Sequence, residues 1–193
     1  MRVFGIDPGS ERTGYGCVET DGCRHRLVAC GAITAHQADT FPLRLARIHA
    51  ELSSLLASLH PDCVAIENLF YATNVRSALK LGHARGVAML AAIEAGCEVI
   101  EYTPAEIKRA VVGYGRAEKH QVQHMVKLIL GLAAVPSPHD AADALAVAIC
   151  HIHSMAPVGI RDSGSGVRVP SPESPIPAKH PRTWRQFRPP TQG

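Results

Sequence analysis

Short apolar runs separated by glycine-rich turns fill the first third of the chain. Arg2–Asp7 is an apolar run that ends in Pro-Gly, and Thr13–Glu19 and Arg24–Thr34 follow it with the same character. Runs of this length between turn residues are typical of β-strands. The pattern therefore predicts three consecutive strands that pair as antiparallel neighbours.

Later in the chain, apolar positions at helical spacing alternate with short buried runs. Leucine and isoleucine recur every three or four residues between Phe41 and Leu59, which predicts an amphipathic helix. The further elements are expected, in chain order, as a strand at Cys63–Glu67, a helix at Asn74–Ala95, a strand at Glu98–Tyr102, helices at Pro104–Val112 and Glu118–Leu130, and a helix from Ser137 to about His153. This order predicts an α/β domain with a mixed sheet and right-handed crossovers.

Composition places a boundary near residue 156. Hydrophobic residues make up 46% of the 193 residues, which is enough for one sizeable core. Residues 157–193 instead hold eight of the 14 prolines, and six basic residues against two acidic ones. We expect one folded domain over residues 1–156 and a flexible basic tail over 157–193. The tail either contacts polyanions nonspecifically or serves only as a solubilising extension.

The six cysteines are dispersed without a CxxC pair, so we interpret them as reduced, mostly small core residues. The pairs His120/His124 and His151/His153 have no cysteine pair beside them, so a structural zinc site is not expected. No apolar run is long enough to span a membrane, and the chain opens without a charged segment followed by an apolar one. These features predict a cytoplasmic protein.

Four acidic residues stand in apolar surroundings. Asp7 and Glu67 end two predicted strands, and ligands of α/β sheets bind at the carboxyl ends of strands. Asp140 and Asp143 are three residues apart, on one face of the last predicted helix. Carboxylates about 4 Å apart repel by roughly 4 kcal/mol at an effective dielectric of about 20, so four converging ones require protonation or divalent cations. Hard oxygen ligands select Mg²⁺ or Mn²⁺, and paired ions of this kind serve phosphoryl transfer.

Local interpretations of two of these acids stay open. Asp7 precedes Pro-Gly, where an aspartate can simply begin a turn. Ser137 followed by proline is a good helix start, which would make Asp140 a residue of the capping turn. Asp143 lies beyond that cap, and Glu67 ends a strand type that normally carries no charge. Capping and turn formation therefore do not explain Glu67 and Asp143.

Five segments of the chain resemble one known family. They are GIDPGSERTGYG, AIENLF, SALKLGHARGV, YTPAEIKRAVVGYGRAEKHQVQHMV and HDAADALAVAICH. In order and spacing they are similar to the RuvC family of bacterial Holliday-junction resolvases, over nearly all of residues 1–155. The resemblance implies an RNase H-like fold with a central five-stranded mixed sheet. It also implies a structure-specific endonuclease of homologous recombination and DNA repair, which nicks two strands of like polarity at a four-way junction and leaves 5′-phosphate and 3′-hydroxyl ends.

The resemblance assigns the four acids to catalysis. Asp7, Glu67, Asp140 and Asp143 match the family's acidic positions and would hold Mg²⁺, two ions per subunit, with Mn²⁺ as a possible substitute. Some relatives carry histidine at the position of Asp140. Here His139 only precedes an intact aspartate, so we interpret it as a bystander, with a ligand or proton relay as the alternative.

Basic residues crowd the segment before the last helix. In family terms Lys108 and Lys119 match the basic residues near the scissile phosphate, and with Arg116 they are expected to contact DNA without reading its sequence. The alternative for each is a solvated helix face. Glu106 in the same segment is interpreted as the capping-box partner of Thr103 and is excluded from catalysis.

Two aromatic residues, Phe70 and Tyr71, follow the strand that ends at Glu67. An exposed ring there would stack on unpaired bases, and the family uses an aromatic residue at the Phe70 position to open base pairs at the junction centre. Packing onto the following helix is the alternative for both rings and the preferred one for Tyr71.

A homodimer is expected because two symmetric cuts call for two sites related by a twofold axis. Gly82 and Gly86 in the helix after the aromatic pair form a GxxxG pattern. Packing on the sheet explains such a pattern in a water-soluble chain as well as dimerisation does. The branch-migration proteins RuvA and RuvB are implied as further partners by the resemblance.

Three other functions compete with a junction resolvase. An RNase H-like nuclease that cuts RNA in hybrids would need the same acids. DPGSERTGYG also resembles the phosphate turn of actin-like and sugar-kinase proteins, but those need two duplicated domains, which 156 residues do not provide. A non-catalytic junction-binding relative is disfavoured because all four acids are intact.

Overall fold

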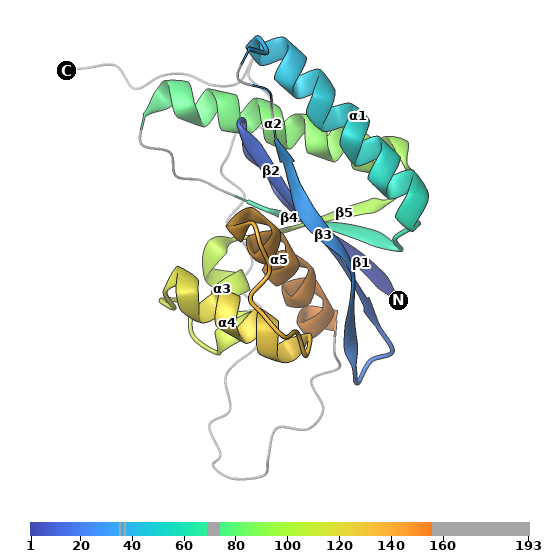
Figure 1. Cartoon of the computed structure of the whole chain (residues 1–193), viewed down its shortest axis with the longest axis vertical. Coiled ribbons are helices and arrows are strands. Elements are labelled where there is room, and N and C mark those ends of the chain that lie inside the picture. Colours follow the sequence, from blue (N-terminus) through green and yellow to red (C-terminus); the bar gives the residue numbers. More distant parts are fainter. Residues whose placement is uncertain (35, 37, 69–73, 156–193) are drawn as a thin grey trace, which may run out of the picture. The chain divides into compact units, whose positions relative to one another are not determined.

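A computed structural model describes residues 1–34, 36, 38–68 and 74–155 of the chain. Figure 1 shows strands and helices that follow the predicted order. The strands are β1 (Arg2–Asp7), β2 (Arg12–Thr20), β3 (His25–Thr34), β4 (Cys63–Glu67) and β5 (Glu98–Tyr102). The helices are α1 (Phe41–Leu59), α2 (Val75–Glu94), α3 (Pro104–Val112), α4 (Lys119–Ile129) and α5 (His139–Met155). The predicted tail over 157–193 lies outside the described residues.

The five strands form one mixed sheet in the order β3-β2-β1-β4-β5. The two hairpin-connected pairs β1/β2 and β2/β3 are antiparallel, whereas β4 lies parallel to both β1 and β5. Helix α1 leads into β4 and helix α2 leads into β5. A helical connection is the usual way for a chain to begin a further parallel strand at the same end of a sheet. The predicted α/β class with a mixed sheet is confirmed.

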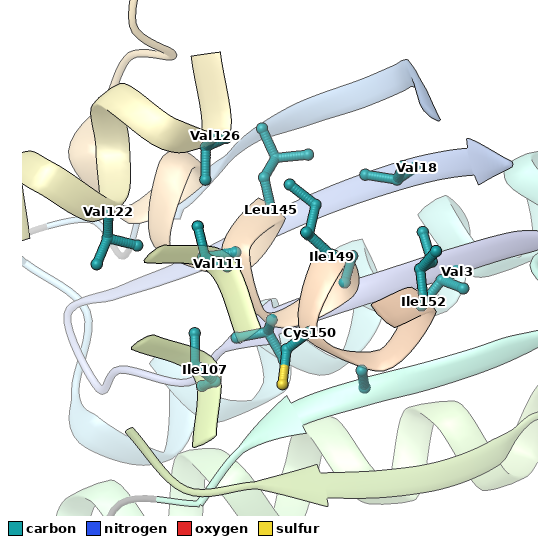
Figure 2. Packing of buried hydrophobic residues seen from close by; sticks show 14 of the residues in the cluster. Val3, Val18, Ile107, Val111, Val122, Val126, Leu145, Ile149, Cys150 and Ile152 are labelled. Atoms are coloured by element: carbon teal, nitrogen blue, oxygen red, sulfur yellow. The ribbon is translucent and has the colours of Figure 1, made fainter. Parts of the chain in front are cut away.

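Helices cover both faces of the sheet, as Figure 1 shows, and each face has its own core. Alternate residues of β1 serve the two cores: Phe4 packs with α1 and α2, and Val3 packs with the opposite layer. That second layer consists of α3, α4 and α5, with Val126, Leu145 and Ile149 among its fully buried residues (Figure 2). Four of the six cysteines are buried in these cores, as expected of small core residues.

Helix α5 lies unusually close to the sheet because β1 and β2 carry glycine beneath it. A Cβ atom added at Gly5 would stand 2.0 Å from the carbonyl oxygen of Ala144, and one at Gly14 would stand 2.1 Å from that of Asp140. No side chain fits in such a space. The two glycines therefore determine how far α5 can settle onto the strands.

Two predicted helix starts have different outcomes. At α3, Thr103 and Glu106 form the predicted capping box, so Glu106 is engaged in capping. Helix α5 begins at His139, two residues after Ser137, so the prediction of Ser137 as its N-cap is wrong. The amide of Ala141 bonds the carbonyl of Pro138, which places Pro138 before the helix rather than inside its first turn.

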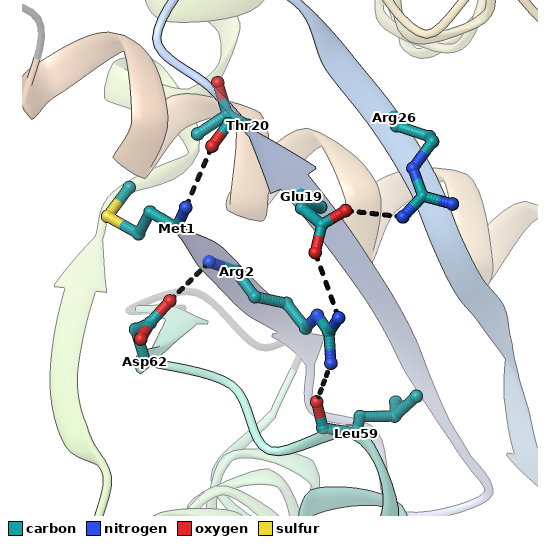
Figure 3. A network of polar contacts seen from close by, with 7 residues as sticks. All are labelled: Met1, Arg2, Glu19, Thr20, Arg26, Leu59 and Asp62. Carbon is teal, nitrogen blue, oxygen red and sulfur yellow. Dashed lines mark hydrogen bonds and ion pairs between the residues drawn. The ribbon is translucent and has the colours of Figure 1, made fainter.

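A polar network ties the strands together at the end of the sheet opposite Asp7 (Figure 3). The Arg2 guanidinium donates to Glu19 on β2 and to the carbonyl of Leu59 at the end of α1, and Glu19 also accepts from Arg26 on β3. The Arg2 amide donates to Asp62 before β4. These contacts hold the start of β1 in register, and so support the end that carries Asp7.

None of the helices within the described ranges has the length and apolar content needed to cross a membrane.

Candidate active site

The register of β1 and β4 brings two acids to neighbouring strand ends. Ile6 pairs with Ile66 in the parallel ladder, so Asp7 and Glu67 follow at the same edge of the sheet. Their side chains share a hydrogen bond. The sequence-based expectation that these two acids open on the same edge is thus confirmed.

Helix α5 adds a third acid to the same hollow and a fourth beside it. Asp143 lines a hollow of about 370 Å³ together with Asp7 and Glu67. Asp140 lines a neighbouring hollow instead, although its charge still acts on Asp7. The four predicted acids therefore gather at one end of the sheet, with Asp140 at the border between two hollows.

Burial and mutual repulsion change the protonation of this cluster. The pKa of Asp7 is raised from an ordinary 3.8 to about 8 by burial first and then by the negative charges of Glu67, Asp143 and Asp140. Burial also raises the pKa of Glu67, while the hydrogen bond from Asp7 opposes that rise. Asp7 consequently keeps the proton near neutral pH and donates it in a hydrogen bond to the Glu67 carboxylate.

Cationic side chains neutralise the other two acids. The Nζ atom of Lys119, the first residue of α4, stands 2.6 Å from Oδ2 of Asp143. The guanidinium of Arg12, at the start of β2, stands 3.8 Å from Oδ2 of Asp140. Lys108 of α3 lines the acidic hollow, and its charge acts on Glu67. Both lysines predicted for phosphate contacts therefore lie beside the acids.

The donor set fits a hard divalent cation. Among the described residues, the side chains that line the acidic hollow offer only carboxylate oxygens as metal ligands, and its apolar wall consists of Pro104, Ile107, Val122 and Ala146. Such a wall strengthens electrostatic interactions in the hollow. As the side chains stand, no three histidine, cysteine, aspartate or glutamate side chains in the described parts of the chain surround one point as ligands. The negative charges of the four acids are instead balanced by the proton on Asp7 and by the cations of Lys119 and Arg12.

The other predicted site residues lie apart from the acids. Arg116 is exposed between α3 and α4 and does not belong to the described lining of the acidic hollow. His139 is exposed at the first position of α5. Phe70 and Tyr71 lie outside the described residues, so their predicted roles are not tested.

Sequence reasoning missed Arg12. It considered GIDPGSERTGYG as a phosphate turn and as the segment that carries Asp7, but gave no role to its arginine. Its position at the start of β2, directly after the turn, was the available indication, because the antiparallel hairpin returns β2 to the edge where β1 ends. The ion pair between Lys119 and Asp143 depends on how α4 packs on α5, which the sequence pattern does not specify.

Comparison with known proteins gives a consistent result. The family described as "Crossover junction endodeoxyribonuclease RuvC" matches residues 3–151. The crossover junction endodeoxyribonuclease RuvC of Koribacter versatilis is 54% identical over 157 residues, covering 81% of this chain and 95% of that protein. The RuvC of Trichlorobacter lovleyi is 47% identical over 189 residues, covering 98% of this chain and 100% of that protein, so this similarity extends past residue 156.

The fold has a counterpart among solved structures. T. thermophilus RuvC in complex with a Holliday junction substrate matches with a TM-score of 0.77 and 38% identity, covering 81% of this chain and 95% of that chain. The match includes the mixed sheet with helices on both faces, and it identifies the architecture as RNase H-like, as predicted.

Proposed function

The chain belongs to the RuvC family of crossover junction endodeoxyribonucleases, and from this membership we propose that it resolves four-way DNA junctions by hydrolysing one phosphodiester bond in each of two strands of like polarity. The nicks would carry 5′-phosphate and 3′-hydroxyl ends. The observation that carries the proposal is the hollow in which Asp7, Glu67 and Asp143 meet Lys108 and Lys119. Acids that hold cations and lysines that contact phosphate are what such a hydrolysis requires.

Dependence on a divalent metal ion is general in this family of nucleases. For this chain we propose Mg²⁺, two ions per subunit, with Mn²⁺ as a substitute, held by Asp7, Glu67, Asp140 and Asp143. When bound, such ions activate water for attack on the phosphorus and stabilise the leaving oxygen.

Before the four acids can hold metal ions, one protonation state and one ion pair in the site must change. Asp7 has to release its proton before its carboxylate can act as a ligand, and Asp143 has to part from Lys119. The freed Lys119 ammonium, together with Lys108, would then neutralise the charge that develops on the phosphate. The apolar wall of the hollow, with Ile107 and Val122, would limit the access of bulk water to the reacting group.

Contacts farther from the acids stay predictions. Arg116, exposed between α3 and α4, would bind the DNA backbone. Phe70 would stack on bases at the junction centre. RuvA and RuvB remain predicted partners.

We also propose a homodimer through α2. Its outer side carries Val75, Leu79, Leu90 and Ile93 with exposed fractions of 77%, 60%, 51% and 61%. Between them, an added Cβ at Gly82 or Gly86 would meet nothing within 4 Å, so these glycines do not pack on the sheet. For the described residues, the alternative interpretation of the GxxxG pattern, packing on the sheet, is therefore wrong. A contiguous apolar stripe with small residues at its centre suits helix contact across a twofold axis.

Cleavage of an end-labelled four-way junction tests the proposed function. The junction should have a mobile core, and linear duplex and an RNA/DNA hybrid serve as competing substrates. We expect paired nicks in the junction with Mg²⁺ and none with EDTA. Asp7→Asn should reduce cutting by more than about 100-fold, which exceeds the loss typical of residues that only hydrogen-bond to a metal ligand, and should retain junction binding. Glu51→Gln, which removes an exposed acid from α1, is the matched control.

The other possible outcomes would each indicate a different function or a different mechanism. Cutting of the hybrid in preference to the junction would indicate a general RNase H-like nuclease. Junction binding without cutting in wild type would indicate a recognition protein. Full activity of Asp7→Asn would remove Asp7 from the mechanism.

A further inference from the structure

A second hollow of about 790 Å³ adjoins the acidic one and has no role in the function proposed above. It is lined by residues 9–12 of the β1–β2 connection, Thr34 at the end of β3, Arg44 of α1, and Asp140. Asp140 places it directly beside the catalytic acids, because the same carboxylate acts on the charge of Asp7.

The two hollows lie in sequence along one edge of the sheet. The acidic hollow stands over the ends of β1 and β4, with Lys108 and Lys119 in its lining. The second hollow stands at the β1–β2 connection and the end of β3, on the other side of β1 in the strand order. A DNA strand that presents its scissile phosphate to the acids has further phosphates on both sides of it. One of them would pass over the second hollow.

Two arginines suit this hollow to phosphate. Arg12 exposes 58% of its side chain, and at 3.8 Å from Asp140 it is held by charge rather than by a hydrogen bond. Arg44 is half-buried, and its Nε donates to the carbonyl of Asp39 at 3.0 Å. Guanidinium groups bind phosphate through several parallel donors. Glu11 is the exposed acid of the lining and opposes an anion there.

The connection that carries Arg12 is fixed before any ligand arrives. The hydroxyl of Thr13, which is fully buried, donates to the carbonyl of Gly9 at 2.8 Å and accepts from the Gly9 amide at 3.4 Å. A Cβ at Gly9 would stand 2.0 Å from the carbonyl oxygen of Arg12, so the turn is closed tightly on itself. A rigid loop loses little conformational entropy when it binds.

We propose that Arg12 and Arg44 form a second phosphate subsite, which binds a backbone phosphate of the cleaved strand next to the scissile one. The proposal rests on the function proposed above, because it takes the position of the scissile phosphate from the acids. The subsite fixes the register of the strand over the acids and contributes affinity that does not depend on base sequence.

Junction affinity as a function of salt concentration, measured in EDTA, tests the subsite without cutting. Each lost phosphate contact makes the slope of log K against log salt concentration shallower by about 0.9. We expect this change in Arg12→Gln and again in Arg44→Gln. Glu11→Gln should bind more tightly. Arg24→Gln, which removes an exposed arginine from the β2–β3 hairpin at the far end of the sheet, should keep the wild-type slope.

Neutral methylphosphonates placed one at a time beside the scissile position locate the contact. In wild type, one position should weaken binding, and Arg12→Gln should abolish most of that position's effect. Circular dichroism shows whether each variant is folded, and Arg12→Gln alone suffices if Arg44→Gln unfolds. The subsite alone would be overturned if wild type binds and cuts the junction while Arg12→Gln keeps the wild-type salt slope. In that case the effects of the methylphosphonate and of Arg12→Gln on binding would also be additive. A wild type that neither binds nor cuts the junction would overturn the proposed function.

Discussion

At the scale of single residues, the site contains an aspartate, Asp7, whose pKa is far above its ordinary value. Asp7 has a pKa of about 8 in the folded chain, against an ordinary 3.8, because it is buried beside other acids. Between these two values the folded chain keeps a proton that the unfolded chain has lost. The free energy of unfolding therefore falls as pH rises from about 4 to about 8. The cluster destabilises the metal-free fold at neutral pH.

Asp7→Asn should remove this contribution, because an amide does not titrate. In EDTA we expect the variant to exceed wild type in stability by a margin that grows from about pH 4 to pH 8. A gain of about 1 kcal/mol corresponds to about 2 to 4 °C in Tm for a domain of this size. Mg²⁺ should narrow the margin, since ligands of the folded state stabilise it by mass action.

Thermal unfolding at a series of pH values measures this margin. Glu51→Gln, an exposed acid on α1, is the control and should follow wild type at every pH. Parallel profiles for wild type and Asp7→Asn would show that Asp7 is ionised in the folded chain, contrary to its position in the cluster.

The sequence predicted part of this site and could not predict the rest. Asp7 and Glu67 were predictable because they end buried strands, and neighbouring parallel strands end at one edge. Asp140 and Asp143 share a helix face only approximately, since three residues turn a helix to within roughly 60° of a full turn. That difference is enough for Asp143 to enter the acidic hollow while Asp140 lines the next one.

At the scale of elements, local residues determined most boundaries. The helix Phe41–Leu59 and the strands Cys63–Glu67 and Glu98–Tyr102 have the predicted ends. Turn-forming residues and apolar periodicity agree there, so local preference and tertiary packing give the same result. The start of α5 was predicted wrongly because Ser137-Pro138 satisfies the local rules for a helix start as well as the observed start does. Packing of α5 against the sheet decides between them.

That packing gives a prediction at Gly5. The variant Gly5→Ala would place a methyl group 2.0 Å from the Ala144 carbonyl, so α5 must move away from β1. Overpacking of this kind costs about 1 to 3 kcal/mol of unfolding free energy. Since α5 carries Asp143, cutting should also weaken under conditions where the variant stays folded.

Urea unfolding and junction cleavage measure both effects. Gly115→Ala is the matched control, because its added Cβ would stand 3.4 Å from the nearest atom, the Ala105 carbonyl oxygen. We expect it to change stability by less than about 0.5 kcal/mol. Equal stability of the two variants would mean that α5 does not depend on the glycine for its closeness to β1.

At the scale of the whole molecule, the two sides of the sheet serve different tasks. On one side, α3, α4 and α5 carry Lys108, Lys119, Asp140 and Asp143, whereas on the other side α2 leaves an apolar stripe exposed. An exposed apolar stripe of this length is costly in water unless something covers it. A second copy of the chain is the occupant that the chemistry favours, because one site cuts one strand and a resolved junction needs two symmetric cuts.

A charge in this stripe should therefore separate the subunits. Wild type should sediment as a dimer of twice 20.6 kDa at micromolar concentration, and Leu79→Glu and Leu90→Glu as monomers. Leu128→Glu, on α4, is the control because Leu128 is 57% exposed, close to the 60% of Leu79, but lies outside the stripe. The monomeric variants should retain stability, since they replace exposed side chains, yet lose coordinated cutting and leave singly nicked junctions. A monomeric wild type, or a dimeric Leu79→Glu with paired cuts, would place the twofold contact on another surface.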